Sequence, residues 1–290
     1  MIGIVLAVFA ALAFGFSVVL IRKKIDESNF FFAALVLTVT GNIILWPLAF
    51  LFTDLRTFNF EGVLFFAVAG ILAPGIARLG YYKGMEVVGV SVNASIFAAY
   101  PMYSSILAVL LLREVLTMEK WIGIVCIVVG VVYVERGLIN LKTGPERISK
   151  KGLAFPILAS LAIALSQIVR KHGLNIYNQP LLGVAIGYSS TLLLYVPLLI
   201  SSNTTWGSTF SVKDFRMFWK AGVGMSLGWI LSFYALSHEN VSIVAPLLQT
   251  EPLFIFFFVY LYLKKLEHIS FKLVISTLLI VIGVTLFTIR

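Results

Sequence analysis

The chain has 290 residues, of which 60% are hydrophobic and only 12% are charged. Soluble proteins carry about 25% charged residues, so this composition excludes a soluble globular protein, and the high hydrophobicity excludes intrinsic disorder. The formal net charge of +9 does not require a nucleic-acid partner, because the cytoplasmic loops of membrane proteins are rich in Lys and Arg. We therefore predict an integral membrane protein that contacts lipid and no nucleic acid.

Long apolar runs predict ten transmembrane helices, because about 20 mainly apolar residues cross a hydrocarbon core of about 30 Å. Transmembrane β-strands would alternate apolar and polar residues, and these continuous runs do not. The predicted fold class is therefore all-α. In chain order the expected spans are Ile2–Ile21, Phe30–Thr53, Gly62–Tyr82, Ser91–Leu112, Trp121–Val134, Gly152–Val169, Leu181–Ser201, Ala221–Leu236, Val241–Leu263 and Leu273–Ile289.

The charges of the loops predict the orientation of these helices. The loops that follow the first, third, fifth, seventh and ninth spans carry 15 Lys and Arg residues, whereas the other loops and the two termini carry 6. Basic loops stay on the cytoplasmic side of a membrane. We therefore expect a multi-pass protein of the cell membrane with both termini outside.

The two halves of the chain resemble each other, which predicts a first repeat over 1–137, a basic linker over 138–151 and a second repeat over 152–290. Five helices is an odd number, so the second copy enters the membrane upside down. Inverted repeats are typical of alternating-access transporters, and a duplicated scaffold without transport is the alternative. The matching residues are Gly3, Leu12, Ala13 and Ser17 with Gly152, Leu161, Ala162 and Ser166, then Val90, Ser91, Ala94 and Pro101 with Val241, Ser242, Ala245 and Pro252.

Further motifs follow in both halves: the stretch from Ala94 to Pro101, Arg113-Glu114-Val115-Leu116-Thr117, Gly123 to Gly130, Ala245-Pro246-Leu247, Glu251-Pro252-Leu253-Phe254, Glu267 and Gly283. With these motifs the chain resembles the EamA-like branch of the drug/metabolite transporter superfamily over nearly its whole length. The resemblance implies a secondary transporter of small metabolites. Amino acids or related organic solutes are the first expectation for the cargo, and cationic amphiphiles exported by a multidrug transporter are the second.

Two charged residues lie inside the expected spans, Arg78 and Glu251. Such charges cost about 2.5–3.5 kcal/mol on insertion scales and indicate function. At a repeat shift of 151, Arg78 corresponds to Trp229 and Glu251 to Tyr100. This pairing favours a zwitterion, whose carboxylate meets Arg78 and whose ammonium meets Glu251. The alternatives are a static ion pair between the two side chains, or an Arg78 that snorkels to the interface.

Helical spacing predicts which residues line the cargo site. We expect Arg78 and Tyr82 on one face, Asn93, Phe97, Tyr100 and Ser104 on a second, and Trp229 and Phe233 on a third, with Ser17, Ser166 and Gln167 nearby. Ordinary packing in the core or against lipid is the alternative for each aromatic residue. Pro101 and Pro252 are expected as hinges or as fixed kinks, and Glu114 and Glu267 as structural residues near helix ends.

The sequence does not support an enzymatic function, because the three histidines lie far apart in the sequence and no hydrolase, metalloprotease or P-loop motif occurs. We expect no cofactor and no metal ion. Without a nucleotide-binding motif, active transport must use an ion gradient, such as that of protons, or substrate counter-transport, and Glu251 is the candidate proton-coupling residue. A channel is a further alternative, but it would need a continuous polar pore that the spans do not offer.

Overall fold

The computed structural model describes residues 1–25, 29–54, 58–88, 90–138, 151–201, 211–263 and 271–288. The predicted linker lies outside these ranges except for its end residues, as does Glu267. The first half of the described chain contains α1 (Ile2–Arg22), α2 (Phe30–Phe52), α3 (Phe60–Gly70), the π-helical turn η3 (Ile71–Ile76), α4 (Ala77–Val88), α5 (Val90–Phe97), α6 (Tyr100–Leu112) and α7 (Met118–Leu138). The second half contains α8 (Ala154–Ile176), α9 (Pro180–Ser201), α10 (Val212–His238), α11 (Val241–Leu248), α12 (Glu251–Leu263) and α13 (Phe271–Thr288).

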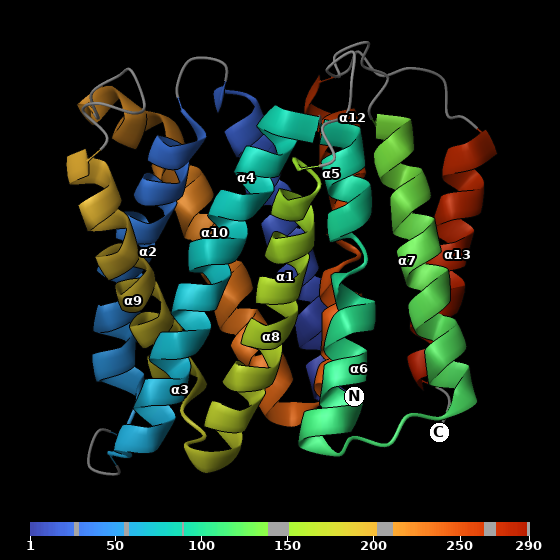
Figure 1. The fold of residues 1–290 in the computed structure, drawn as a ribbon, viewed down its shortest axis with the longest axis horizontal. Helices are drawn as coiled ribbons and strands as arrows, with labels where there is room; N and C mark the ends of the chain where they lie inside the picture. The colour runs from blue at the N-terminus through green and yellow to red at the C-terminus, as the bar shows by residue number, and fades with distance from the viewer. Residues whose placement is uncertain are drawn as a thin grey trace.

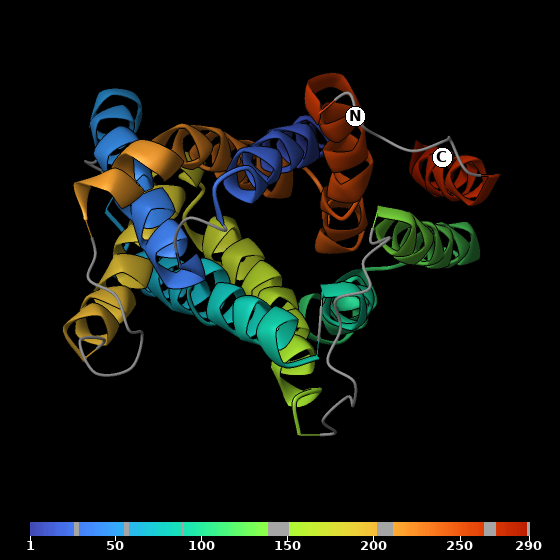
Figure 2. The ribbon, with the colours of Figure 1, turned by 90° about the horizontal axis from the view of Figure 1, so that it is seen from above.

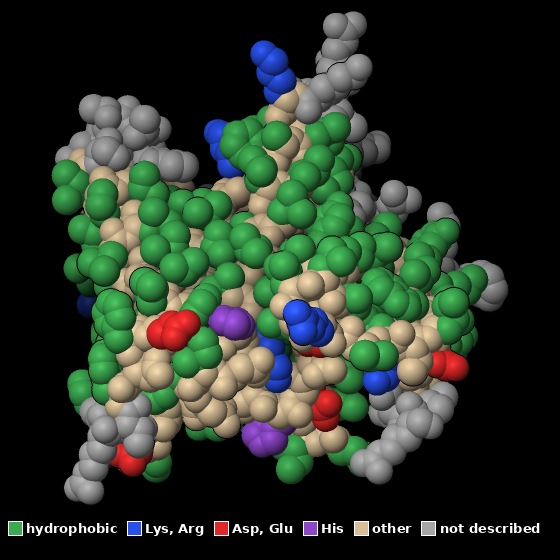
Figure 3. Space-filling view, turned by 60° about the horizontal axis from the view of Figure 1, so that its bottom comes forward, with side chains coloured by type: hydrophobic (Ala, Val, Ile, Leu, Met, Phe, Trp, Pro, Cys, Tyr) green, Lys and Arg blue, Asp and Glu red, His purple; other side chains and the backbone are tan. Residues whose placement is uncertain are grey.

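The outer surface has the polarity of a membrane protein. Hydrophobic side chains cover the flank of the helical bundle, and charged and histidine side chains gather at the end that faces the viewer (Figure 3). Leu193 is 74% exposed and Leu110 is 68% exposed, which water would disfavour and lipid would not. The described helices that are long and apolar enough to cross a membrane cover Ile2–Ile21, Phe30–Phe52, Phe60–Val88, Ala154–Ile176 and Pro180–Ile200.

Three of the expected spans are broken helices. Between α3 and α4 the backbone of Ala73 is extended, with φ −149° and ψ 126°, because the residue before a proline avoids helical geometry. The other two interruptions fall at residues 98–99, between α5 and α6, and at residues 249–250, between α11 and α12. These last two breaks are 151 positions apart, as the repeat predicts.

The two expected hinge prolines follow these breaks directly. Pro101 is the second residue of α6, and Pro252 is the second residue of α12. A proline in the first turn of a helix removes an N–H that has no intrahelical acceptor in any case. Both prolines therefore begin a new helix at the break and leave its hydrogen bonding intact.

The carbonyl groups freed at the α3–α4 break are bound by side chains of α8 and α9. Because an unpaired carbonyl in hydrocarbon is costly, these donors stabilise the break. The hydrogen bonds run from Ser166 Oγ to the oxygens of Ala69 (2.8 Å) and Ala73 (3.4 Å), from Arg170 Nη2 to Ala73 (3.4 Å), from Thr191 Oγ1 to Gly70 (2.8 Å), and from the Tyr195 hydroxyl to Pro74 (3.2 Å) and Gly75 (3.0 Å).

Helices that are far apart in the sequence pack side by side. Helix α1 lies against α10, where a Cβ at Gly228 would collide with the Phe14 ring. Seen from above, α7 and α13 lie next to each other at one side of the bundle (Figure 2). The two termini lie at the same end of the molecule (Figure 1), and there the N-terminal ammonium binds Glu239 at 2.9 Å.

Helices of the two halves also bind each other at that end. Glu114, just after α6, accepts hydrogen bonds from the backbone N–H groups of Val241 (2.8 Å) and Ser242 (3.1 Å) and from the Ser242 hydroxyl. These N–H groups belong to the first turn of α11, which has free donors and a positive dipole end. Glu114, expected to be structural, thus caps a helix of the other half.

Candidate functional site

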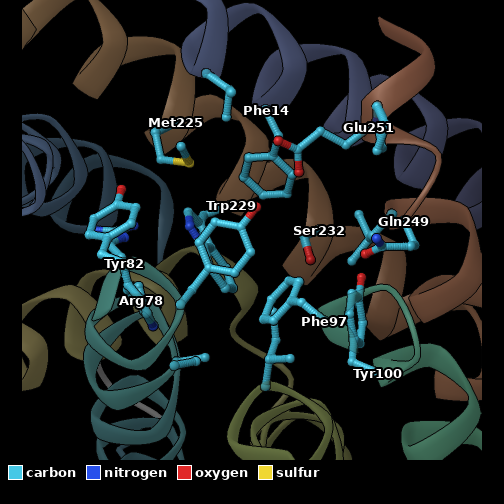
Figure 4. Close-up of a pocket in the computed structure, with 18 of the residues that line it drawn as sticks. Phe14, Arg78, Tyr82, Phe97, Tyr100, Met225, Trp229, Ser232, Gln249 and Glu251 are labelled. Carbon is cyan, nitrogen blue, oxygen red and sulfur yellow. The ribbon is translucent and has the colours of Figure 1, made fainter. Parts of the chain in front are cut away.

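A cavity of about 240 Å³ lies where α1, α4, α8, α10 and the breaks of the α5–α6 and α11–α12 pairs meet. Most of the predicted site residues line it, and Figure 4 shows several of them pointing into the same space. The predicted residues in its wall are Arg78, Tyr82, Phe97, Tyr100, Gln167, Trp229, Glu251 and Pro252. Arg78, Trp229, Tyr100 and Glu251, the four residues that the predicted repeat relates, thus share one cavity.

The cavity separates the two charges that were expected to act together. Arg78 and Glu251 lie on opposite sides of the pocket in Figure 4, in contrast to the static ion pair considered above. The Arg78 guanidinium is held from α2 and α9, with Nη1 at 3.4 Å from the Thr38 hydroxyl and with Tyr188 and Tyr195 beside it. These contacts hold the guanidinium among helices of the bundle, whereas a snorkelling arginine would extend to the membrane interface.

Glu251 owes its position to the break before α12. It is the first residue of α12, directly after the non-helical residues 249–250. Tyr82 and Tyr100 lie close enough to interact electrostatically with its carboxylate. The Tyr100 hydroxyl donates to the carbonyl of Ala245 at 3.1 Å, which ties the first half to α11.

Aromatic rings form much of the wall. Phe97 contacts Tyr81 edge-on with ring centroids 4.7 Å apart, and Tyr100 at 5.5 Å. Phe14 contacts Trp229 edge-on at 5.6 Å. Aromatic faces attract cations by up to about 2 kcal/mol when water is excluded. The cavity therefore offers a cation two kinds of partner, a carboxylate and aromatic faces.

Several predicted residues lie outside the cavity wall. Their side chains pack against neighbouring helices or donate hydrogen bonds to backbone carbonyls. Asn93 is fully buried against Gly84 of α4, Phe233 packs on Phe66 and Arg170, Ser17 donates to Ala13, Ser104 donates to Pro101, and Ser166 donates to the α3–α4 break. Pro101 does not line the cavity either.

Arg170 is the central residue that sequence reasoning missed. The prediction of only two charges inside the spans is wrong, because α8 continues to Ile176 instead of ending at Val169. Arg170 is 1% exposed and donates to Gln167 Oε1 at 3.1 Å and Ser166 Oγ at 2.9 Å. Its guanidinium carbon lies 4.5 Å from the centroid of the Trp229 ring.

Other residues of the wall were also unexpected. Pro74, inside the third expected span, marks the α3–α4 break, and an internal proline is a signal that the sequence does carry. Ser232 and Gln249 line the cavity without any motif to distinguish them. Among the residues that the structure describes, no group of three or more His, Cys, Asp and Glu side chains could hold a metal ion.

Comparison with known proteins shows the family to which the chain belongs. The sequence profile of the EamA-like transporter family matches residues 1–136 and 150–289. An uncharacterized transporter of Archaeoglobus fulgidus is 23% identical over 288 residues, which cover 99% of this chain and 98% of that protein. An uncharacterized transporter of Helicobacter pylori is 22% identical over 255 residues, which cover 86% of this chain and 82% of that protein.

A solved crystal structure has the same fold. It superposes with a TM-score of 0.77 over 99% of this chain and 95% of that one, at 12% sequence identity. At this identity the likeness concerns the fold alone. The family profile, by contrast, covers both halves of the chain. The protein therefore belongs to the EamA-like transporter family, and it is a multi-pass membrane transporter.

Proposed function

We propose that the protein is a secondary transporter with ten transmembrane helices in two inverted repeats, residues 1–137 and 152–290. The corresponding breaks at residues 98–99 and 249–250 support this arrangement. So does the position of both termini at one end of the bundle, which an even number of crossings requires (Figure 1). Alternating access would then move the halves around the site between them.

The cavity is the proposed cargo site. The observation that carries this proposal is one cavity with Arg78 on one side, Glu251 on the other and aromatic rings between them. A small zwitterion fits this separation of charge, with its ammonium group toward Glu251 and its carboxylate toward the side of Arg78. Amino acids or related organic solutes are therefore the proposed cargo. Asn93 and Phe233 would act behind the wall, by supporting it.

The broken helices are the proposed moving parts. The breaks of the α5–α6 and α11–α12 pairs each join two short helices through two residues, so rotation there disturbs few helical hydrogen bonds. Pro101 and Pro252 keep these two breaks in place because a proline cannot extend the preceding helix. Glu251 adjoins one break, so a change in its charge state would act where the helices move. Proton coupling at Glu251, or exchange of one cargo molecule for another, would drive accumulation.

Counterflow in proteoliposomes tests this function. Vesicles holding the purified protein are loaded with one unlabelled amino acid at a time, and entry of the same labelled amino acid is measured. We expect entry above that of empty vesicles for at least one amino acid. Arg78→Ala should abolish this entry, whereas Lys83→Ala, outside the cavity on the same helix, should preserve it.

The same vesicles distinguish the other readings. Entry of tetraphenylphosphonium without entry of any amino acid would identify a multidrug transporter of cationic amphiphiles. Ion currents far above the turnover of a carrier would identify a channel. Vesicles that move none of these solutes would contradict the proposed transport of small organic solutes.

A further inference from the structure

Two buried hydrogen-bond donors of the cavity wall have no partner within the described residues. Trp229 and Ser232 lie three residues apart on α10, so they share a face of this helix, and both line the cavity. Trp229 is 8% exposed and Ser232 is fully buried. Neither the indole Nε1–H nor the Ser232 hydroxyl makes a hydrogen bond in the described structure.

Two other serines of α10 and a tryptophan of α2 have hydrogen-bond partners. On the same helix, Ser226 donates to the carbonyl of Gly222 at 2.7 Å, and Ser237 donates to that of Tyr234 at 2.8 Å. Serines inside helices commonly satisfy their hydroxyl in this way. Trp46 of α2 donates its Nε1–H to the Ser189 hydroxyl at 2.8 Å. Other buried side chains, such as Ser105 and Asn93, also lack a partner within the described residues, but Trp229 and Ser232 are the ones that line the cavity.

A positive charge lies beside the Trp229 ring. The Arg170 guanidinium carbon is 4.5 Å from the centroid of the Trp229 ring. Its hydrogen-bond acceptors in the described structure are neutral: Gln167 Oε1, Ser166 Oγ and the Ala73 carbonyl. A buried charge whose partners are all neutral leaves a positive potential in a medium of low dielectric constant. That potential favours a negative group in the adjacent cavity.

We propose that Trp229 and Ser232 form an anion subsite of the cargo cavity, in which the two donors bind a carboxylate and Arg170 supplies the charge behind it. An indole N–H can only donate, so its partner must be an acceptor. Carboxylate oxygens accept from both donors at once, and such charged hydrogen bonds are stronger than neutral ones. This inference rests on the proposed function, because it assigns a place to one end of the same cargo.

The proposed subsite assigns the two charged groups of the cargo to different residues of the cavity. Figure 4 shows Ser232 in the middle of the cavity, Trp229 toward the side of Arg78, and Gln249 and Glu251 on the other side. Arg78 is occupied by Thr38 and the neighbouring tyrosines and contributes charge from a distance. A cargo carboxylate at Trp229 and Ser232 leaves its ammonium group free to face Glu251.

Binding measurements with three matched probes test the subsite. L-Leucine carries both charges, L-leucinamide lacks the carboxylate, and 4-methylpentanoate lacks the ammonium group. Affinities are obtained from the ligand-dependent melting temperature of the purified full-length protein. Trp229→Phe and Ser232→Ala each remove one donor and keep the packing of the wall. Trp219→Phe and Ser237→Ala, on the same helix but away from the cavity, are the matched controls.

We expect the wild type to bind both carboxylates more tightly than leucinamide. Each donor variant should weaken leucine and 4-methylpentanoate by about tenfold or more, the usual effect of one hydrogen bond to a charged group. Leucinamide affinity should stay unchanged, and both control variants should match the wild type. The two donor variants support each other, so a folding defect in one leaves the other as the test.

Three results would overturn the inference. Wild-type protein that binds neither carboxylate, or binds leucine and leucinamide equally, has no anion subsite for these probes. A carboxylate preference that survives both donor variants places the subsite elsewhere. An equal loss for all three probes shows a defect of packing. These binding results are independent of the counterflow assay. A carboxylate preference that needs both donors would support the subsite even if the protein failed the counterflow assay, which would refute the proposed transport.

Discussion

At the scale of single residues, Arg78 and Glu251 line the cavity, and Arg170 lies beside the Trp229 ring of its wall. Arg170 is stabilised by neutral acceptors and by the ring faces of Trp229 and Phe233, and Arg78 by Thr38 and nearby tyrosines. Burying such charges is costly, which a purely structural protein would avoid by using apolar residues. With two arginines and one carboxylate, the positive charge in this part of the bundle exceeds the negative charge, which favours a cargo that contains an anionic group.

Glu251→Gln is expected to separate accumulation from exchange. Glutamine keeps the size and polarity of the side chain but cannot bind and release a proton, so the variant should not concentrate the cargo under a proton gradient. Counterflow should persist in part, because exchange needs no net proton movement, although the lost carboxylate weakens the contact with the cargo ammonium group. Uptake in proteoliposomes with and without an imposed pH gradient measures both activities.

The control for this variant is Glu119→Gln, at an exposed position in the first turn of α7. It should accumulate cargo like the wild type. A Glu251→Gln variant that still concentrates cargo under the proton gradient would exclude Glu251 as the coupling residue.

At the scale of helices, the breaks are stabilised by side chains from other elements. The α3–α4 break has its carbonyl groups bound from α8 and α9, and α11 has its first N–H groups bound by Glu114. An interrupted helix inside a membrane persists only when such partners satisfy its backbone. The interruptions are therefore built into the packing of both halves.

Tyr195→Phe is expected to destabilise the α3–α4 break. The change removes only the hydroxyl that donates to Pro74 and Gly75, and an unsatisfied buried acceptor costs about 1–3 kcal/mol. The melting temperature of the purified protein should fall. Tyr133→Phe, at a tyrosine that is 46% exposed on α7, is the control and should melt like the wild type. Equal melting temperatures for both variants would show that the hydroxyl does not support the break.

Glu114→Gln is expected to loosen the start of α11. The carboxylate accepts hydrogen bonds from Val241 and Ser242 at the positive end of the helix, and the amide loses both the charge and one acceptor. Loss of such a cap costs about 0.5–2 kcal/mol. Thermal unfolding measures the effect, with the exposed Glu119→Gln as the control. A stability equal to that of the control would show that the cap contributes nothing measurable.

At the scale of the whole molecule, the two ends of the bundle differ in charge. The end with the termini also holds the connection between α6 and α7, because Glu114 binds α11 beside the N-terminus and Glu239 (Figure 1). The loops of this end carry few Lys and Arg residues, whereas the loops of the opposite end carry most of them. The positive-inside rule therefore predicts that the termini face outside.

Cysteine labelling tests this orientation. In a Cys126→Ala background, Val115→Cys introduces a thiol at a residue that is 84% exposed, at the end with the termini. Lys24→Cys introduces one at the opposite end, just after α1. A membrane-impermeant maleimide added to intact cells should label residue 115 and not residue 24. The reverse pattern would invert the predicted topology.

The sequence by itself determined the class of the protein and much of its cavity. Apolar runs and loop charges act locally, so they predict membrane helices without knowledge of their neighbours. Comparison of the halves identified Arg78, Tyr100, Trp229 and Glu251 as corresponding residues, and all four line one space. Correspondence between repeats can be read from a sequence because it needs no knowledge of contacts.

Only the tertiary structure decided the roles of residues whose environment comes from other helices. In the sequence Arg170 looks like a loop residue, because the expected span ends at Val169. Its role depends on acceptors on its own helix and at the α3–α4 break, and on aromatic neighbours on α10. Ser232 looks like any helical serine until its hydroxyl is found without an acceptor beside the cavity. Burial and hydrogen bonding depend on which helix faces meet, and long-range packing sets those faces.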